Sequence, residues 1–150
     1  MLDHALATAR RRGSAVAVLF VDLDRFKAIN DALGHSAGDA ALIATTERLR
    51  ASLRETDFLA RLAGDEFVIV CEDLPADASA AADKMRALGQ RLHTGLGQPA
   101  HINGTEIQLS ASIGVALSTG GAGTEDMFSE ADTAMYRAKE RDHGNVVIGP

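Results

Sequence analysis

The sequence "RLAGDEFVIV", residues 61–70, predicts a β-hairpin with two adjacent acids at its tip. Residues 58–62 and 67–70 have the composition of two strands, and the "AGDE" between them matches the length of a tight turn. Strands joined this closely pair antiparallel. The side chains of Asp65 and Glu66 are therefore expected at one end of a sheet.

Another strand is predicted at residues 15–21, where "AVAVLFV" is continuously apolar and rich in β-branched side chains. Such a run is typical of a central strand that is buried on both faces. If this strand lies beside the hairpin, Asp22 at its end converges with Asp65 at one edge of the sheet. Convergent carboxylates without clustered Cys or His favour hard cations such as Mg²⁺, which share their ligands with phosphate oxygens. The pattern predicts a nucleotide site.

Hydrophobic periodicity predicts helices around these strands. The opening helix becomes basic at residues 10–12 and ends at Gly13. The next helix is predicted from Asp39, placed as an N-cap or first-turn acid, to about Leu53. A longer helix is predicted at about residues 78–96.

The last third of the chain adds a hairpin, a strand and a helix. Asn103-Gly104 is a strong turn signal between residues 100–102 and 105–109, and the chain continues through "SASIGVAL" as a second strand or a bulged extension. Thr124 is expected to cap the last helix, and "NVVI" to close the sheet. The interleaved elements predict an α+β fold with a mixed, mainly antiparallel central sheet surrounded by helices.

The composition predicts one globular domain over residues 1–150, because 46% of the residues are hydrophobic. The longest wholly apolar run, residues 15–21, is too short to cross a bilayer, so a soluble chain is expected. Cys71 has no partner for an internal disulfide and is expected to be a buried structural thiol. The formal net charge of −6 disfavours nonspecific binding to nucleic acid. Neither nucleic acid nor a membrane is an expected partner of this domain.

The acids also have a plainer interpretation. Asp24 and Asp31 match ordinary loop and surface acids, and Asp65 and Glu66 by themselves match residues that keep a hairpin tip soluble. The spacing of the acids favours a metal site and leaves this plainer interpretation open.

Four separated motifs carry a more specific signal: "FVDLDRFKAINDALGHSAGDAAL", "RETDFLARLAGDEFVIV", "SASIGVAL" and "ADTAMYRAKERDHGN". In order and spacing, over almost the whole chain, they resemble the GGDEF family, the diguanylate cyclases. The resemblance implies a fold like the palm of nucleotidyl cyclases and polymerases, an α/β sandwich. It also implies an enzyme that condenses two GTP molecules into cyclic di-GMP and pyrophosphate with Mg²⁺ or Mn²⁺.

By position, the resemblance implies that the Asp22 carboxylate and the Leu23 carbonyl ligate the metal. Asp65 would supply the second carboxylate and take the proton of the 3′-hydroxyl, with Glu66 in support; a metal-bound hydroxyl is easier to deprotonate. Lys27 resembles a lysine that stabilises the transition state, and its plainer interpretation is a solvated lysine.

Phe26 lies with Lys27 at the turn that meets the triphosphate in the family. Asn30 and Asp39 match the pair that reads guanine. A carboxylate accepts from N1 and N2 of guanine and an amide bonds the base edge, so adenine would leave both groups poorly paired. Lys139 matches a phosphate-binding lysine on the last helix.

Two positions depart from the family pattern. Ala63 replaces the first glycine of the signature, where a methyl group would crowd the phosphates or strain the backbone. His143 stands four positions after the lysine, where the family has an arginine, and a neutral imidazole does not replace a bidentate guanidinium. Arg141 is an alternative contact. A working or weakened enzyme is expected.

Arg54 and Asp57, in "RETD", stand at the spacing of the family's inhibitory RxxD motif. There a guanidinium fork and a carboxylate bind an intercalated cyclic di-GMP dimer. Outside the family context, the same pair matches a surface ion pair that contributes little. Product inhibition is thus an expectation from the resemblance.

The resemblance also implies a homodimer. One domain binds one GTP, so a symmetric product needs two domains that face each other. The chain lacks the "LTGLxNR"-like turn that precedes the opening helix in the family. We therefore expect a single GGDEF domain cut from a longer protein, with the domain in the cytoplasm and the full-length protein either soluble or membrane-anchored.

The alternative function is a module that binds GTP or cyclic di-GMP and regulates a neighbouring domain without turnover. Ala63 and His143 favour this alternative, whereas the intact polar residues of the other motifs favour the enzyme.

Overall fold

The computed structural model describes residues 1–141 and 146–149. The helices are α1 (Leu2–Arg12), α2 (Phe26–Leu33), α3 (His35–Ala51), α4 (Ala78–Leu96) and α5 (Thr124–Glu140). The strands are β1 (Ala15–Leu23), β2 (Phe58–Ala63), β3 (Glu66–Leu74), β4 (Ala100–Ile102), β5 (Thr105–Ile107), β6 (Ala111–Ser118) and β7 (Val146–Ile148).

β1 is the central strand of a five-stranded sheet with the order β2-β3-β1-β6-β7. It pairs antiparallel with β3 and with β6, and β7 adds to β6 in parallel. The predicted mixed, mainly antiparallel sheet is confirmed. The register places Asp22 opposite Glu66 on one side and opposite Ser112 on the other.

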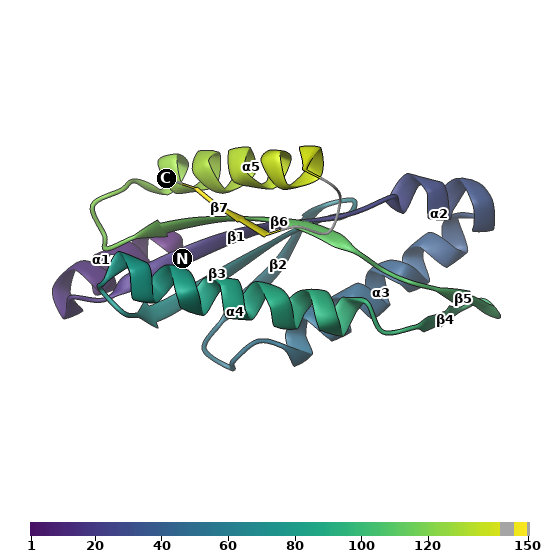
Figure 1. The fold of residues 1–150 in the computed structure, drawn as a ribbon, viewed down its shortest axis with the longest axis horizontal. Helices are drawn as coiled ribbons and strands as arrows, with labels where there is room; N and C mark the ends of the chain where they lie inside the picture. Colours follow the sequence, from purple (N-terminus) through teal and green to yellow (C-terminus); the bar gives the residue numbers. More distant parts are fainter. Residues whose placement is uncertain (142–145, 150) are drawn as a thin grey trace.

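Side chains of β1 alternate between the two faces of the sheet, and each face has its own core. Ala17, Leu19 and Val21 pack on the side of α3 and α4, whereas Val16 and Val18 pack on the side of α1 and α5. Figure 1 shows these layers, with α5 above the sheet and α4 below it. Burial on both faces explains why the sequence of this strand is continuously apolar.

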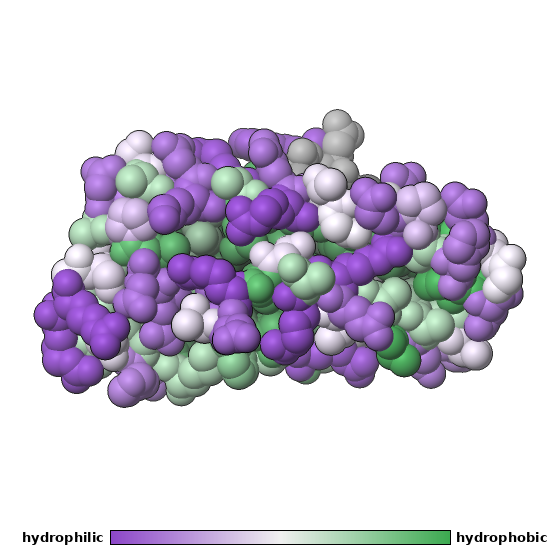
Figure 2. Space-filling model, turned by 90° about the horizontal axis from the view of Figure 1, so that it is seen from below, coloured by the Kyte–Doolittle hydropathy of each residue, from purple (hydrophilic) through white to green (hydrophobic). Residues whose placement is uncertain are grey.

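The surface seen from below is mainly hydrophilic, with small apolar areas between polar side chains (Figure 2). Large apolar side chains that are exposed include Ile43 on α3 and Phe58 and Leu62 on β2. Within residues 1–141 and 146–149, no helix combines the length and the apolar composition of a membrane span.

Two helix starts differ from the predicted ones. The chain forms an additional helix, α2, and α3 begins at His35, so Asp39 lies inside α3 and its predicted place at the N-cap or in the first turn is wrong. Gly34, with φ of 90°, turns the chain between the two helices. The N-cap of α5 is Gly123, and the hydroxyl of Thr124 donates instead to the carboxylate of Asp3.

The chain after the turn at Asn103-Gly104 follows one of the two predicted alternatives. β4 and β5 form a separate two-stranded sheet, and β6 begins as a new strand at Ala111. Figure 1 shows this small sheet projecting beyond α3, away from α1.

Gly114 in β6 lets α5 approach the sheet closely. A Cβ atom at this position would overlap the main-chain nitrogen of Met135 and the main-chain oxygen of Ala131, both in α5. Backbone therefore packs on backbone at this crossing. Lys139 lies one helical turn after Met135, so this contact also sets where its side chain reaches the sheet.

Substitution Gly114→Ala is expected to lower the free energy of unfolding by about 3 kcal/mol, because the overlap falls on main-chain atoms that cannot rotate away. Urea denaturation measures the change. Gly121→Ala is the matched control, since a Cβ atom there meets nothing within 4 Å. Equal stability of the two variants would contradict the close packing of α5.

Candidate functional site

The end of β1 brings together the two acids that the sequence singles out. Asp22 is the last acid of the strand, and the N–H of Leu23 donates to the main-chain oxygen of Asp65 at 3.1 Å. Asp65 lies in the turn between β2 and β3, and Glu66 opens β3 opposite Asp22. The hairpin is therefore a neighbour of the central strand, as the predicted convergence required.

Asp22 is buried, with 8% of its surface exposed, yet its carboxylate has one oxygen without a partner. Its Oδ2 lies 3.0 Å from the ammonium nitrogen of Lys139 on α5, and its Oδ1 has no hydrogen-bond partner in the described chain. The pKa of Asp22 is raised to about 6, mainly by burial and also by the nearby Asp65, while Lys139 opposes the shift. Asp22 is thus a carboxylate held in place at an energetic cost.

The unpartnered oxygen of Asp22 fits a cation. No group of three or more His, Cys, Asp or Glu side chains suited to a metal occurs among the described residues, so a chelating cage is absent from that part of the chain. Asp22 and Asp65 offer two carboxylates instead. That number suits Mg²⁺, which usually takes one or two carboxylates and completes its shell with water and phosphate oxygens.

The turn between β1 and α2 carries the next predicted residues. Arg25, before the helix, adopts the left-handed conformation with φ of 57°, which is uncommon for a residue with a side chain. Phe26 is half-buried and packs against the core, whereas Lys27 in the first turn of α2 is exposed. The turn thus presents a cationic side chain near the end of β1.

Asp24 is the residue that sequence reasoning misjudged at this turn. It is buried, and its carboxylate accepts hydrogen bonds from the hydroxyls of Ser110 at 2.6 Å and Ser112 at 2.7 Å. Its N–H donates to the main-chain oxygen of Ser110 at 2.8 Å. The interpretation of Asp24 as a loop acid is wrong; it joins the end of β1 to β6. The alternating serines of "SASIG" are the only sequence signal of this contact.

Asn30 and Asp39 come from the two helices α2 and α3. The side chain of Asn30 lies against Gly38, where an added Cβ would overlap the amide oxygen. Asp39 is exposed and lines a cavity of about 450 Å³ together with Leu42, Ile43, Thr46, Glu47 and Arg61. This cavity lies between α3 and β2, and Asn30 is not among its lining residues.

The backbone at Ala63 is unstrained. Ala63 ends β2 and is not one of the residues with positive φ, whereas the next residue, Gly64, has φ of 49°. The backbone strain considered for Ala63 is therefore absent, and the hairpin needs glycine at Gly64. The departure at His143 lies outside the described residues; Arg141 directly follows α5.

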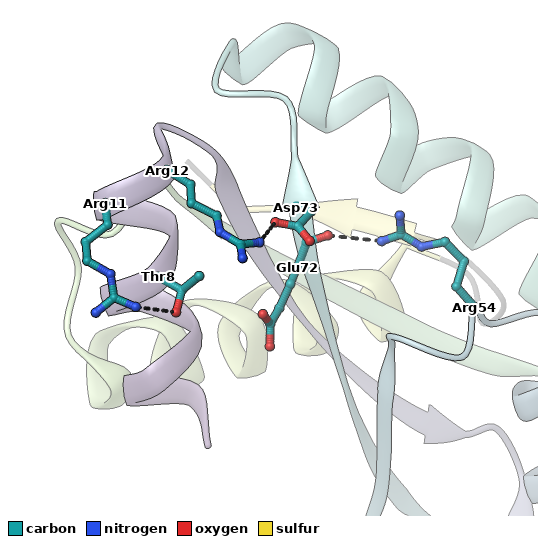
Figure 3. A network of polar contacts seen from close by, with 6 residues as sticks. All are labelled: Thr8, Arg11, Arg12, Arg54, Glu72 and Asp73. Atoms are coloured by element: carbon teal, nitrogen blue, oxygen red, sulfur yellow. Dashed lines mark hydrogen bonds and ion pairs between the residues drawn. The ribbon is translucent and has the colours of Figure 1, made fainter.

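Arg54 and Asp57 form an ion pair within a compact turn, in which the carboxylate is buried and the arginine is half exposed. Asp57 is buried and accepts from the N–H of Arg54 at 2.9 Å and from its guanidinium at 3.1 Å. The guanidinium also donates to the main-chain oxygen of Glu72 at 3.0 Å, and Asp73 beside it pairs with Arg12 of α1 (Figure 3).

A cavity of about 190 Å³ adjoins this turn. Arg54 and Asp57 line it with Lys84 and Arg91 of α4, so cationic side chains from two elements face the same space. Cys71 is buried nearby, which confirms a structural thiol, and burial raises its pKa. A ligand in this cavity would meet three basic side chains and one buried carboxylate.

The chain is similar to known proteins over almost its whole length. The family model described as "Diguanylate cyclase, GGDEF domain" matches residues 1–145. Among curated proteins, the bifunctional diguanylate cyclase/cyclic di-GMP phosphodiesterase MucR of Pseudomonas aeruginosa is 46% identical over 142 residues, which are 93% of this chain and 20% of that protein.

Two further relatives come from the same organism. The diguanylate cyclase TpbB is 40% identical over 96% of this chain and 32% of its own length. The cyclic di-GMP phosphodiesterase NbdA is 39% identical over 93% of this chain and 17% of its own length. The chain thus spans a third or less of the length of these relatives.

Solved structures agree with the fold. The GGDEF domain of TpbB superposes with a TM-score of 0.91 at 36% identity, covering 99% of this chain and 91% of that one. An EAL/GGDEF domain protein from M. capsulatus gives a TM-score of 0.80 at 40% identity, covering 99% and 94%. These matches show that the chain belongs to the GGDEF family, the diguanylate cyclases.

Proposed function

We propose that this chain is a diguanylate cyclase domain that condenses two GTP molecules into cyclic di-GMP and pyrophosphate. The observation that carries the proposal is the meeting of Asp22 and Asp65 at the end of β1, with one Asp22 oxygen buried and unpartnered. In each half-reaction the 3′-oxygen of one GTP bonds to the α-phosphorus of the other. The bond from that phosphorus to the bridging oxygen breaks, and pyrophosphate leaves.

The carboxylates of Asp22 and Asp65 and the carbonyl of Leu23 would hold Mg²⁺ or Mn²⁺. When bound, the ion would neutralise phosphate charge and favour loss of the 3′-hydroxyl proton. Asp65 would accept that proton, and Glu66, its neighbour on β3, would support the site electrostatically. The ammonium of Lys139 lies 3.0 Å from Asp22, and it would bind a phosphate that arrives beside this carboxylate.

Phe26 would position the turn between β1 and α2, and Lys27 would approach the charge that develops on the phosphates, where a preplaced cation lowers the barrier. Asn30 and Asp39 would read the guanine base from α2 and α3. The tight contact of Asn30 with Gly38 limits where the amide can lie, so the base edge would meet a fixed partner.

We further propose that two copies of the domain face each other in the cytoplasm, each supplying one GTP. Among the described residues of each copy, Asp22 and Asp65 form one pair of carboxylates at the end of β1, and the product joins two nucleotides symmetrically. Cyclic di-GMP would inhibit by binding at the cavity beside Arg54. Asp57 would act mainly by holding that arginine, because its carboxylate is buried against it.

A second candidate is a regulatory module that binds GTP or cyclic di-GMP without turnover. The relative NbdA, named a phosphodiesterase, favours this candidate because it contains a similar domain.

Turnover of GTP with Mg²⁺ at high protein concentration tests the first proposal. The chain is expected to form cyclic di-GMP, and Asp65→Ala is expected to lose at least about a hundredfold in rate, because the base and a metal ligand are removed together. Chromatography separates the products. No product from a chain that still binds GTP, even after forced dimerisation, would favour the regulatory module.

Asp22→Asn is expected to stabilise the metal-free protein at neutral pH. The pKa of Asp22 is raised from 3.8 to about 6 by folding, so ionisation of the folded chain lowers stability as the pH rises between these values. Above about pH 6 the cost is on the order of 3 kcal/mol, and below about pH 4 it vanishes.

Urea denaturation in the presence of a chelator, at neutral pH and below about pH 4, measures the difference in stability between Asp22→Asn and its parent. Added Mg²⁺ is expected to stabilise the parent chain and not Asp22→Asn, since only the parent keeps both carboxylates. A variant that is less stable than its parent at neutral pH would contradict the account of Asp22.

Arg54→Ala is expected to relieve inhibition by cyclic di-GMP by at least about tenfold, because it removes the cationic fork at the cavity. The initial rate before product accumulates should stay unchanged. Initial rates against added cyclic di-GMP provide the measurement, with exposed Arg86→Ala on α4 as the control. Unchanged inhibition in Arg54→Ala would exclude this site.

A further inference from the structure

Arg61 lies on β2 with its side chain toward α3. It pairs with Phe67 of β3, which packs in the core on the side of α3 and α4. Leu59, two residues earlier on β2, packs in the same core, and side chains two apart share a face of a strand. The strand therefore directs Arg61 into the cavity that Asp39 lines from α3.

The cavity is lined by acidic side chains from α3 and by one arginine from β2. Asp39 and Glu47 line it from α3, and Arg61 is its one basic lining residue. Within residues 1–141 and 146–149, neither Arg61 nor Asp39 has a side-chain hydrogen bond or ion pair. Both side chains face the same space with their bonding capacity unused. Ion pairing across the cavity thus does not explain Arg61.

Guanine carries donors and acceptors on different parts of its ring. N1 and N2 donate, whereas O6 and N7 accept, and arginine is the side chain that most often bonds O6 and N7 together. In the proposed function, Asp39 takes the two donors, and the amide of Asn30 contacts the base edge from α2, outside the lining of this cavity. The acceptors O6 and N7 then need donors, and a planar guanidinium supplies two in parallel. Adenine presents a donor amine in place of O6, so it would meet Arg61 unfavourably.

We propose that Arg61 is a further specificity-determining residue, whose guanidinium donates to O6 and N7 of the guanine of GTP. The inference rests on the proposed function, because it requires the base to lie beside Asp39. The proposed role of Arg61 concerns the base alone. Arg61 takes no part in the proton transfer or in binding the metal.

Binding measurements with two nucleotides, on the parent chain and on Arg61→Ala, test this contact. GTP and 7-deaza-GTP, which lacks the N7 acceptor, are titrated into the parent chain and Arg61→Ala with Mg²⁺, at protein concentrations far below those used for turnover. Arg61→Ala is expected to weaken GTP binding about tenfold and 7-deaza-GTP binding much less. Equal losses for both nucleotides, as for a phosphate contact or a structural role, would overturn the proposal, and so would no loss at all.

Two further variants separate charge from geometry. Arg61→Lys keeps the charge but lacks the fork, so the loss of GTP binding should persist if O6 and N7 are the partners. Recovery of full affinity and of the N7 effect in Arg61→Lys would overturn the bidentate contact. Arg50→Ala, an exposed arginine of α3 outside the cavity lining, is the control for lost surface charge.

Failure of the proposed function can be distinguished from failure of the role proposed for Arg61. A parent chain that shows no preference for GTP over ATP, or no dependence on Asp39, would remove the guanine site and this inference with it. A parent chain that prefers GTP and depends on Asp39, but not on Arg61, would overturn this inference alone.

Discussion

The pairing of β1 on both of its edges positions the acids of the proposed metal site. β3 brings the hairpin acids to one edge, and β6 brings Ser112, with Ser110 just before the strand, to the other. Because the strand is buried on both faces, a one-residue slip would move its whole apolar set out of register. The core therefore fixes the position of Asp22, although Asp22 itself contributes nothing favourable to the core.

Asp22 shows how stability and function oppose each other in this fold. A carboxylate with a partnerless oxygen is costly to bury, and Lys139 offsets only part of that cost. Asparagine at this position would lower the free-energy cost of burial at neutral pH, but it would bind a cation poorly. This energetic cost has an explanation if a cation binds the free oxygen of the carboxylate.

The elements that sequence predicts well are those whose signal is local. The apolar run of β1 and the short connection between β2 and β3 depend on neighbouring residues, so the sheet was predictable in outline. The start of α3 was not, because α2 and α3 adjoin at Gly34 without a proline or a side-chain cap.

The burial of Asp24 and Asp57 was harder to predict. Asp24 is buried by groups that are remote in sequence, and Asp57 by a turn that closes over its carboxylate. The family resemblance supplied the candidate residues, whereas the cavity that joins Asp39 to Arg61 required the packing of a helix against a strand.

The contacts around Asp24 bear on how the domain folds. The hydroxyl of Ser112 and the carboxylate of Asp24 are 88 residues apart in sequence. Contacts of such high sequence separation raise the contact order and are made late, after loop-closure entropy has been overcome. The end of β1 therefore acquires its final shape only when both flanking strands have docked. Without β6 in place, the end of β1 lacks the contacts of Asp24, so activity at the proposed site would report on completed folding.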